Sequence, residues 1–243
     1  MYNTTRKRMT DILKNALHPP KGAAAGGKVN MYTQKKGTRW LAIMALLIAI
    51  QIFLNITGIG LIPLPLIKAT TLHIPVIIGA ILLGPLAGGI LGGVFGLCSI
   101  WNNTMTPALL SFAFSPVIAA ANTGAVGAIK SLWIVLGCRI LIGVVSGWLW
   151  IGLKKRRAPD LVALPIVGAA GALTNTIMVM GSIALLLAPE YAAAQNIAMD
   201  AVMWTILGVI ATSGVAEAIG AVILVTAIGK VLLRVNQAAL RRA

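Results

Sequence analysis

The chain has 243 residues, of which 58% are hydrophobic and only 10% are charged. Its mean hydropathy of +0.93 excludes a soluble globular domain and is typical of a protein with several membrane helices. The formal net charge of +15 does not indicate nucleic-acid binding, because the basic residues are grouped between apolar runs with almost no aromatic residues among them. We therefore expect an all-α integral membrane protein.

A basic segment precedes the first apolar run. Residues 1–39 carry nine Lys or Arg against one acidic residue, Asp11. Basic segments next to membrane helices favour the cytoplasmic side, so we expect residues 1–38 to be a poorly ordered cytoplasmic tail. A six-helix membrane domain should follow over residues 39–235, with a short basic cytoplasmic tail over residues 236–243.

The first membrane helix is expected over residues 40–60. It contains three alanines at spacings of three and four residues: Ala42, Ala45 and Ala49. These spacings put the alanines on one face, and small residues allow another helix to approach closely in lipid. Such spacing also arises by chance in an alanine-rich chain, so both interpretations stay open at this point. Residues 61–71 should form a loop with Pro63 and Pro65, which carries Lys68.

The apolar run from 72 to 101 is long enough for one tilted span or for two short ones. The distribution of positive charge decides between them. The basic tail and the basic cluster at residues 154–157 both belong in the cytoplasm, so an even number of crossings separates them. A break at Gly84-Pro85 gives spans over 72–84 and 87–101 and satisfies that condition.

The fourth span is then expected over residues 127–152, the fifth over 161–187 and the sixth within 202–233. In the last stretch we expect a short outer helix and a kink at Ser213-Gly214 before the span itself. A competing arrangement makes residues 108–121 a span, but this segment is short and contains a proline. We expect it to be an outer loop with some buried apolar character. The sequence thus predicts six crossings, with the N- and C-termini cytoplasmic.

Three basic residues do not fit this charge distribution, whereas the other 17 of the 20 lie on the cytoplasmic side: the three are Lys68, Lys130 and Arg139. Arg139 and Glu217 lie inside apolar runs, where a charge is costly unless it faces a cavity or a partner. They either pair as part of the structure or line a pocket that opens outward. Four polar residues would line it with them: Asn102, Asn103, Asn175 and Thr176. This set suits a small molecule with a carboxylate and hydroxyls.

Catalytic and metal-binding motifs are missing from the sequence. It contains two histidines, no HExxH motif, no Cys/His cluster and no Walker motif. We therefore expect neither an enzyme nor a cofactor or metal site, and no nucleotide hydrolysis by this chain. The glycines of residues 88–96 lack the Lys-Ser/Thr of a phosphate loop and are typical of close helix packing.

Five segments carry a family resemblance, together with Ala45 and Ala49 of the first helix: HIPVIIGAILLGP at 73–85, SIWNNT at 99–104, CRILIGVVSG at 138–147, GALTNTIMVMG at 171–181 and SGVAEAIGAVI at 213–223. Over about residues 38–235 the chain resembles the substrate-binding S components of energy-coupling factor (ECF) vitamin importers. Within that family it is most similar to the pantothenate-specific branch. The basic tail before Met31 departs from the family pattern.

The resemblance implies a six-helix bundle in a bacterial cell membrane that binds one vitamin near its outer face. It also implies a separate membrane scaffold and two cytoplasmic ATPases as partners, with Ala45 and Ala49 against the scaffold. The whole subunit would reorient in the membrane to release substrate inside. Another small vitamin, or an independent secondary transporter, remains the alternative, although the two halves of the chain show no internal repeat.

If the ligand is pantothenate, its site needs one cation and several neutral hydrogen-bonding groups, because the ligand is a monoanion with two hydroxyls and an amide. Arg139 lies nine residues below Lys130, or roughly 13 Å, and so is partly removed from water. Its guanidinium is expected to bind the carboxylate. Asn175 and Thr176, with Asn102 or Asn103, would meet the other groups, Glu217 would orient donors or balance Arg139, and Lys68 is the next candidate cation.

Overall fold

The computed structural model describes residues 37–58, 61–63 and 68–241, so most of the predicted basic tail lies outside it. The α-helices of this part are, in chain order, α2 (Thr38–Thr57), α3 (His73–Leu83), α4 (Pro85–Met105), α5 (Ser111–Phe114), α6 (Pro116–Leu132), α7 (Cys138–Lys155), α8 (Asp160–Leu186), α9 (Ala188–Gln195), α10 (Val202–Val209) and α11 (Val215–Arg241). The shorter elements are strands β1 (Leu61–Pro63) and β2 (Lys68–Thr70), π segments η1 (Trp133–Gly137) and η3 (Ile210–Gly214), and the 3₁₀ turn η2 (Met199–Ala201).

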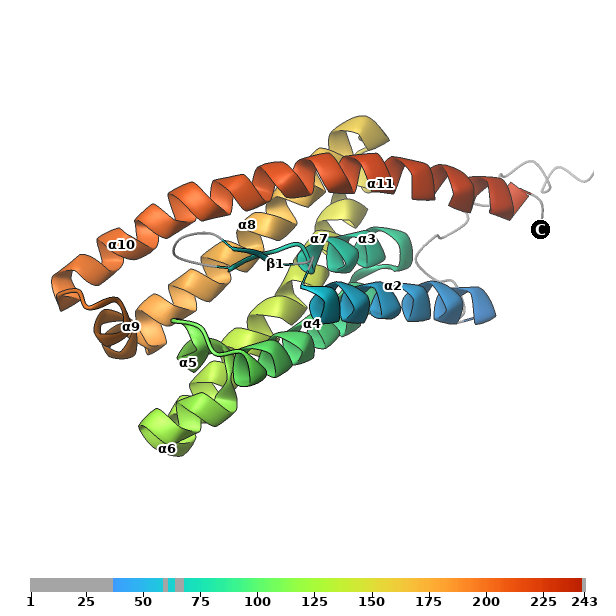
Figure 1. Ribbon diagram of the computed structural model, residues 1–243. Coiled ribbons are helices and arrows are strands. Elements are labelled where there is room, and N and C mark those ends of the chain that lie inside the picture. The colour runs from blue at the N-terminus through green and yellow to red at the C-terminus, as the bar shows by residue number, and fades with distance from the viewer. Residues whose placement is uncertain (1–36, 59–60, 64–67, 242–243) are drawn as a thin grey trace, which may run out of the picture. The chain divides into compact units, whose positions relative to one another are not determined.

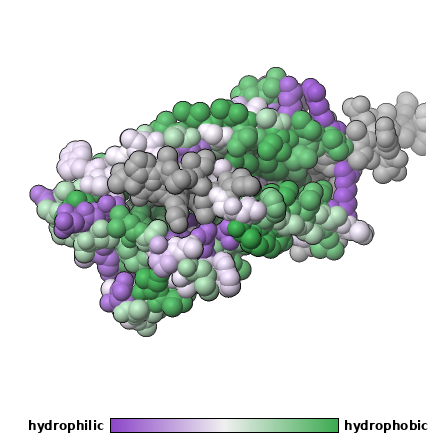
Figure 2. Space-filling view, viewed as in Figure 1, coloured by the Kyte–Doolittle hydropathy of each residue, from purple (hydrophilic) through white to green (hydrophobic). Residues whose placement is uncertain are grey.

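Five helical stretches of the described residues are long and apolar enough to cross a membrane: Thr38–Thr57, Pro85–Met105, Pro116–Lys155, Asp160–Leu186 and Met199–Val235. The predicted helical membrane class is therefore confirmed. Helix α3 is also apolar but has 11 residues, or about 16 Å, roughly half of the hydrocarbon thickness. The crossing expected over residues 72–84, and with it the total of six, thus stays a prediction. Hydrophobic residues cover much of the face in Figure 2, and hydrophilic residues gather mainly toward its two ends.

The break between α3 and α4 falls where the sequence predicts it. Gly84 has φ 95°, a left-handed conformation that favours glycine, and Pro85 occupies the first position of α4. Proline lacks an N–H and fits that position, since the first N–H groups of a helix have no partner within it. The run 72–101 is therefore two helices.

The predicted outer loop over residues 108–121 is wrong in detail, because it contains α5 and the first part of α6. The hydroxyl of Ser115 accepts a hydrogen bond from the Ile118 N–H (3.3 Å), and Pro116 follows it as the first residue of α6. This helix is interrupted at Thr123 and at Gly124, whose φ is 68°. The part before the interruption, residues 116–122, is about 10 Å long and too short to cross a membrane.

The segment after α8 also holds more helix than we expected. The stretch between the predicted fifth span and the predicted sixth span contains α9 and η2. At the predicted kink, Ser213-Gly214, the structure has the π segment η3 within a continuous helix, and Figure 1 shows α10 and α11 as one long ribbon beside α8. A π segment holds an extra residue per turn without ending the helix. The helix then continues to Arg241, beyond the end that we expected.

The predicted proline loop contains a small hairpin. Strands β1 and β2 pair antiparallel, with Leu61 opposite Thr70 and Pro63 opposite Lys68. An isolated hairpin of this length is marginal by itself in water. It leads directly into α3, whose residues from His73 to Ile81 are all buried.

Glycines bring α4 and α7 into backbone contact. A Cβ on Gly88 would lie 2.7 Å from the Gly143 carbonyl oxygen, and one on Gly96 would lie 2.5 Å from the Val135 carbonyl oxygen of η1. A Cβ on Gly147 would lie 2.6 Å from Cα of Pro85. Side chains at these positions would separate the helices, so the predicted close packing is confirmed for this face.

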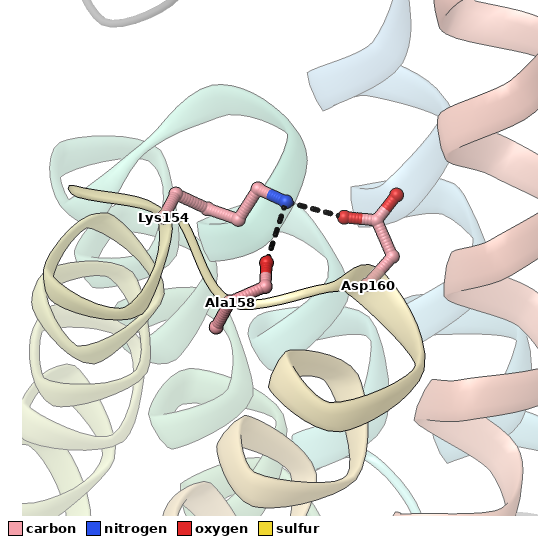
Figure 3. Close-up of polar contacts among 3 residues, drawn as sticks. All are labelled: Lys154, Ala158 and Asp160. Atoms are coloured by element: carbon pink, nitrogen blue, oxygen red, sulfur yellow. Dashed lines mark hydrogen bonds and ion pairs between the residues drawn. The ribbon is translucent and has the colours of Figure 1, made fainter. Parts of the chain in front are cut away.

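The turn between α7 and α8 holds an ion pair (Figure 3). Lys154 Nζ lies 2.6 Å from Asp160 Oδ1 and donates a second hydrogen bond to the Ala158 carbonyl oxygen (3.1 Å). It also lies 5.4 Å from the centroid of the Trp150 ring. Asp160 is the first residue of α8, where a negative charge interacts favourably with the helix dipole.

Candidate functional site

Arg139 is the charged centre of the described bundle. It lies in the first turn of α7 and is only 4% exposed. Its Nη1 donates to the Ile134 carbonyl oxygen (3.1 Å), and its Nη2 donates to Ser99 Oγ (3.4 Å). The guanidinium carbon lies 4.8 Å from the centroid of the Phe95 ring and 5.0 Å from that of Phe114. Two aromatic rings and two hydrogen bonds therefore hold the guanidinium in place.

The π segment η1 prepares this position. It immediately precedes α7 and supplies the Ile134 carbonyl that accepts from Arg139. The Cys138 N–H bonds to the Trp133 carbonyl five residues back, as a π turn requires. Segments of this kind recur at functional sites in other helical proteins.

Asn103 is connected to Arg139, whereas Asn102 is not. Asn103 Nδ2 donates to the Ser99 carbonyl oxygen (2.9 Å), and its Oδ1 accepts from Ser111 Oγ (2.9 Å). Ser99 in turn accepts from Arg139, so α4, α5 and α7 share one network. Asn102 instead donates to Asn55 Oδ1 on α2 (3.4 Å). The structure thus brings one of the two predicted asparagines to the site.

Asn175 and Thr176 are both buried in α8, with exposures of 9% and 6%. Asn175 Oδ1 has no hydrogen-bond partner within the described chain. Thr176 Oγ1 donates to Glu217 Oε2 (3.1 Å), which joins α8 to α11. Glu217 is half-buried, and its charge lies close enough to Arg139 for the two to attract each other. Thr176 therefore links α8 to Glu217 on α11, and Arg139 lies on α7, which packs against α8.

The other two basic residues that do not fit the charge distribution, Lys68 and Lys130, are placed differently. Lys130 Nζ donates to the Leu186 carbonyl oxygen (2.8 Å) at the last residue of α8. A cation there satisfies an unpaired carbonyl and the helix dipole, so Lys130 has a structural partner. Lys68 is the first residue of β2, and its side chain lies outside the described part. In that part, no group of His, Cys, Asp or Glu could hold a metal ion.

The groups that hold Arg139 in place were not predicted from the sequence. Phe95 and Ser99 are four residues apart on α4 and so share a face, which is a signal that the sequence contained. Phe114 comes from α5, and the Ile134 carbonyl is exposed for bonding by the π segment. Neither of the last two leaves a local pattern in the sequence, because each depends on how α5 and α7 pack.

The three alanines of α2 lie on its outward face. Ala42, Ala45 and Ala49 are exposed, whereas Gln51 is wholly buried. Gln51 Nε2 donates to the carbonyl oxygens of Leu72 and Leu91, both at 3.3 Å. These bonds join α2 to the start of α3 and to α4, whereas the alanines are exposed in the described bundle.

Comparison with known proteins identifies the family of this chain. Residues 39–229 match the family model for the substrate-specific component of ECF transporters. The chain is 35% identical over 191 residues to the pantothenic acid transporter PanT of Lactococcus lactis subsp. cremoris (strain MG1363), covering 77% of this chain and 90% of that protein. It is 26% identical over 212 residues to the pantothenate transporter PanT of Leuconostoc mesenteroides subsp. mesenteroides, covering 83% and 96%. The protein is therefore a multi-pass cell-membrane protein that belongs to the family of substrate-specific components of ECF transporters.

Proposed function

We propose that this protein is the pantothenate-binding subunit of an ATP-driven importer. Its similarity to two pantothenate transporters supports this ligand. The observation that carries the proposal is Arg139, a cation that is buried between two aromatic rings inside a membrane bundle. Burying a guanidinium away from water costs much free energy unless an anion pairs with it, and a ligand carboxylate supplies such an anion.

The groups around Arg139 suit the remainder of that ligand. Asn103 and Asn175 offer neutral donors and acceptors for an amide and hydroxyls. Glu217 lies close enough to balance Arg139 when the site is empty, and Thr176 holds its carboxylate. Arg139 would then exchange a weak interaction with Glu217 for a charge-assisted pair with the ligand.

The proposed topology has six crossings, with both termini in the cytoplasm. Figure 1 shows the start of α2 and the end of α11 at the same end of the described helices, and α5, α6 and α9 at the other. An even number of crossings requires such a shared end. Helix α3, which the hairpin β1–β2 precedes, is assigned as the second crossing in chain order and brings the total to six.

The proposed partners are a membrane scaffold subunit and two cytoplasmic ATPases. The family is that of the substrate-specific component, which supplies recognition and not energy. We assign Ala45 and Ala49 to the scaffold contact, because they are exposed and small on the apolar helix α2. Delivery would occur by reorientation of the whole subunit against the scaffold.

A thermal-shift screen of the purified protein against a panel of water-soluble vitamins tests the ligand. A ligand that binds the folded state stabilises it in proportion to the logarithm of its concentration over its dissociation constant. We expect pantothenate to raise the unfolding temperature with this logarithmic dependence. A shift with a different vitamin and none with pantothenate would assign the protein to another substrate.

A further inference from the structure

Three buried polar side chains on the neighbouring helices α7 and α8 have an atom without a hydrogen-bond partner in the described structure. These atoms are Arg139 Nε, Asn175 Oδ1 and Ser146 Oγ. Ser146 is 0% exposed, and the other two residues are also more than nine-tenths buried. Unpaired buried polar atoms are rare and destabilising, so three of them on two neighbouring helices require an explanation.

The three groups lie in a definite order along the antiparallel pair α7 and α8. Near the start of α7, Cys138 Sγ lies 3.6 Å from Ser182 Oγ of α8. Two turns further on, Ser146 Oγ lies 2.7 Å from the position that a Cβ on Gly171 would take. On α8, Asn175 lies between Gly171 and Ser182, four residues from the first and seven from the second. Along the helix axis it therefore lies between the Ser146–Gly171 contact and the Cys138–Ser182 contact.

Arg139 and Ser146 lie on nearly the same face of α7. They are seven residues apart, which is close to two turns, or about 10 Å along the helix. With Asn175 at the level between them, they form a series that we call the polar column: Arg139, Asn175 and Ser146. One end of the polar column is charged, and the rest is neutral.

The Ser146 hydroxyl differs from other hydroxyls in these helices. Thr104 and Thr174 each donate to the carbonyl oxygen four residues earlier, at 2.7 Å. This local bond is the usual solution for a hydroxyl in an apolar helix. Ser146 makes no such bond and points across to Gly171 instead. A Cβ on Gly171 would also lie 2.6 Å from Ile77 Cδ1, so only glycine leaves room beside this hydroxyl.

We infer that the substrate site continues inward from Arg139 along the polar column to Ser146. The ligand then lies along α7 with its carboxylate at Arg139 and its hydroxylated end at Asn175 and Ser146. This inference rests on the proposed function, since it assigns an orientation to pantothenate. An extended ligand with one anionic end and one neutral, hydroxylated end matches a column with one cation and two neutral groups.

Substitution of Ser146 by Ala tests this with two readouts of opposite sign. Without ligand, Ser146→Ala should unfold at a higher temperature than the parent, because it removes an unpaired buried hydroxyl. Its dissociation constant for pantothenate should rise about 3- to 10-fold, which corresponds to one neutral hydrogen bond. If Ser146 had only a structural role, Ser146→Ala would lower the unfolding temperature and leave the dissociation constant for pantothenate unchanged.

Thr226→Val is the matched control. Thr226 Oγ1 on α11 is also buried without a partner in the described residues, but it lies outside the polar column. This variant should gain stability as Ser146→Ala does, while its dissociation constant for pantothenate stays at the parent value. Equal loss of affinity in the two variants would overturn the assignment of Ser146.

Pantothenyl alcohol, in which a hydroxymethyl group replaces the carboxylate, tests the orientation. Ser146→Ala should weaken binding by the same factor for both compounds, because it acts at the unchanged end. Arg139→Gln should weaken the binding of pantothenate strongly and the binding of the alcohol little. The reverse pattern, with the Ser146→Ala effect lost for the alcohol, would overturn the orientation. If the parent does not bind pantothenate at all, the proposed function itself fails, whereas parent binding with an unchanged Ser146→Ala affinity overturns only this inference.

Discussion

Gly92 of α4 lies against the backbone carbonyl of Arg139 on α7, in the middle of the glycine contact between the two helices. A Cβ on Gly92 would overlap that carbonyl oxygen and would approach Ile140 Cα to 2.9 Å. The backbone that carries the candidate ligand-binding arginine is therefore positioned by the absence of a side chain on the neighbouring helix. Phe95 and Ser99, which hold the guanidinium itself, come from the same helix α4.

Gly92→Ala should separate α4 from α7 and displace Arg139. Overpacking of this kind costs about 1–3 kcal/mol of stability, and we expect a lower unfolding temperature together with weaker pantothenate binding. Gly93→Ala is the control, because a Cβ on Gly93 would meet nothing within 4 Å. Thermal unfolding and titration calorimetry of both variants measure the difference. Equal stability of the two would show that α4 and α7 tolerate separation here.

Arg139→Lys should weaken pantothenate binding roughly 10- to 100-fold, the range for loss of a hydrogen bond to a charged group. A lysine keeps the charge but cannot reproduce the planar fork or its contact with Phe95 and Phe114. Calorimetric titration gives the dissociation constant. Arg139→Gln that stays folded and binds like the parent would place the carboxylate elsewhere, with Lys68 as the next candidate.

Lys130→Gln should leave the dissociation constant for pantothenate nearly unchanged. Because Lys130 donates a hydrogen bond to the Leu186 carbonyl at the end of α8, its replacement should lower the stability of the fold. A cation at a helix C-terminus contributes about 0.3–1 kcal/mol when exposed. Thermal unfolding without ligand detects this loss, and a large change in affinity would instead place Lys130 at the site.

Ala45→Trp and Ala49→Trp should abolish transport while pantothenate binding to the isolated subunit stays near the parent value. Both alanines are exposed on α2, so a bulky side chain does not disturb the bundle but prevents close approach of a scaffold helix. The exposed Ala120 on α6 provides the control, and Ala120→Trp should retain transport. Loss of ligand binding in the two α2 variants would mean that this face has an internal role.

Asp160→Asn should lower stability by less than about 1 kcal/mol, because the Lys154–Asp160 pair is partly exposed and therefore weak. Lys154→Ala should cost more, since it also removes the bond to Ala158 and the contact with Trp150 (Figure 3). Thermal unfolding at low and high salt checks both, and added salt should reduce the difference between Asp160→Asn and the parent.

Much of the fold could be predicted because its signals are local. The break at Gly84-Pro85 combines a glycine that tolerates positive φ with a proline that begins a helix. The long apolar runs likewise predict the membrane helices. The π form of η1 and η3 could not be predicted, because neither segment shows a residue pattern for it, although the predicted kink at Ser213-Gly214 marked the position of η3.

The candidate site was predictable only in part, for the same reason. A charge inside an apolar run is visible in the sequence, so Arg139 and Glu217 could be chosen from it. The separation of Asn102 from Asn103 depends on helix phase: neighbours on a helix point about 100° apart, and one meets α2 while the other meets Ser99. Ser146 gave no signal, since an isolated serine in an apolar helix usually bonds to its own backbone.

Uptake of labelled pantothenate by proteoliposomes tests the central claim most directly. The liposomes contain this protein together with an ECF scaffold subunit and two ATPases that face the interior. They are prepared with or without ATP enclosed in that interior. We predict accumulation of pantothenate that requires ATP and all subunits, and that is lost when Ala45→Trp replaces the parent protein. Uptake by this protein alone, driven by an ion gradient and indifferent to ATP, would contradict it.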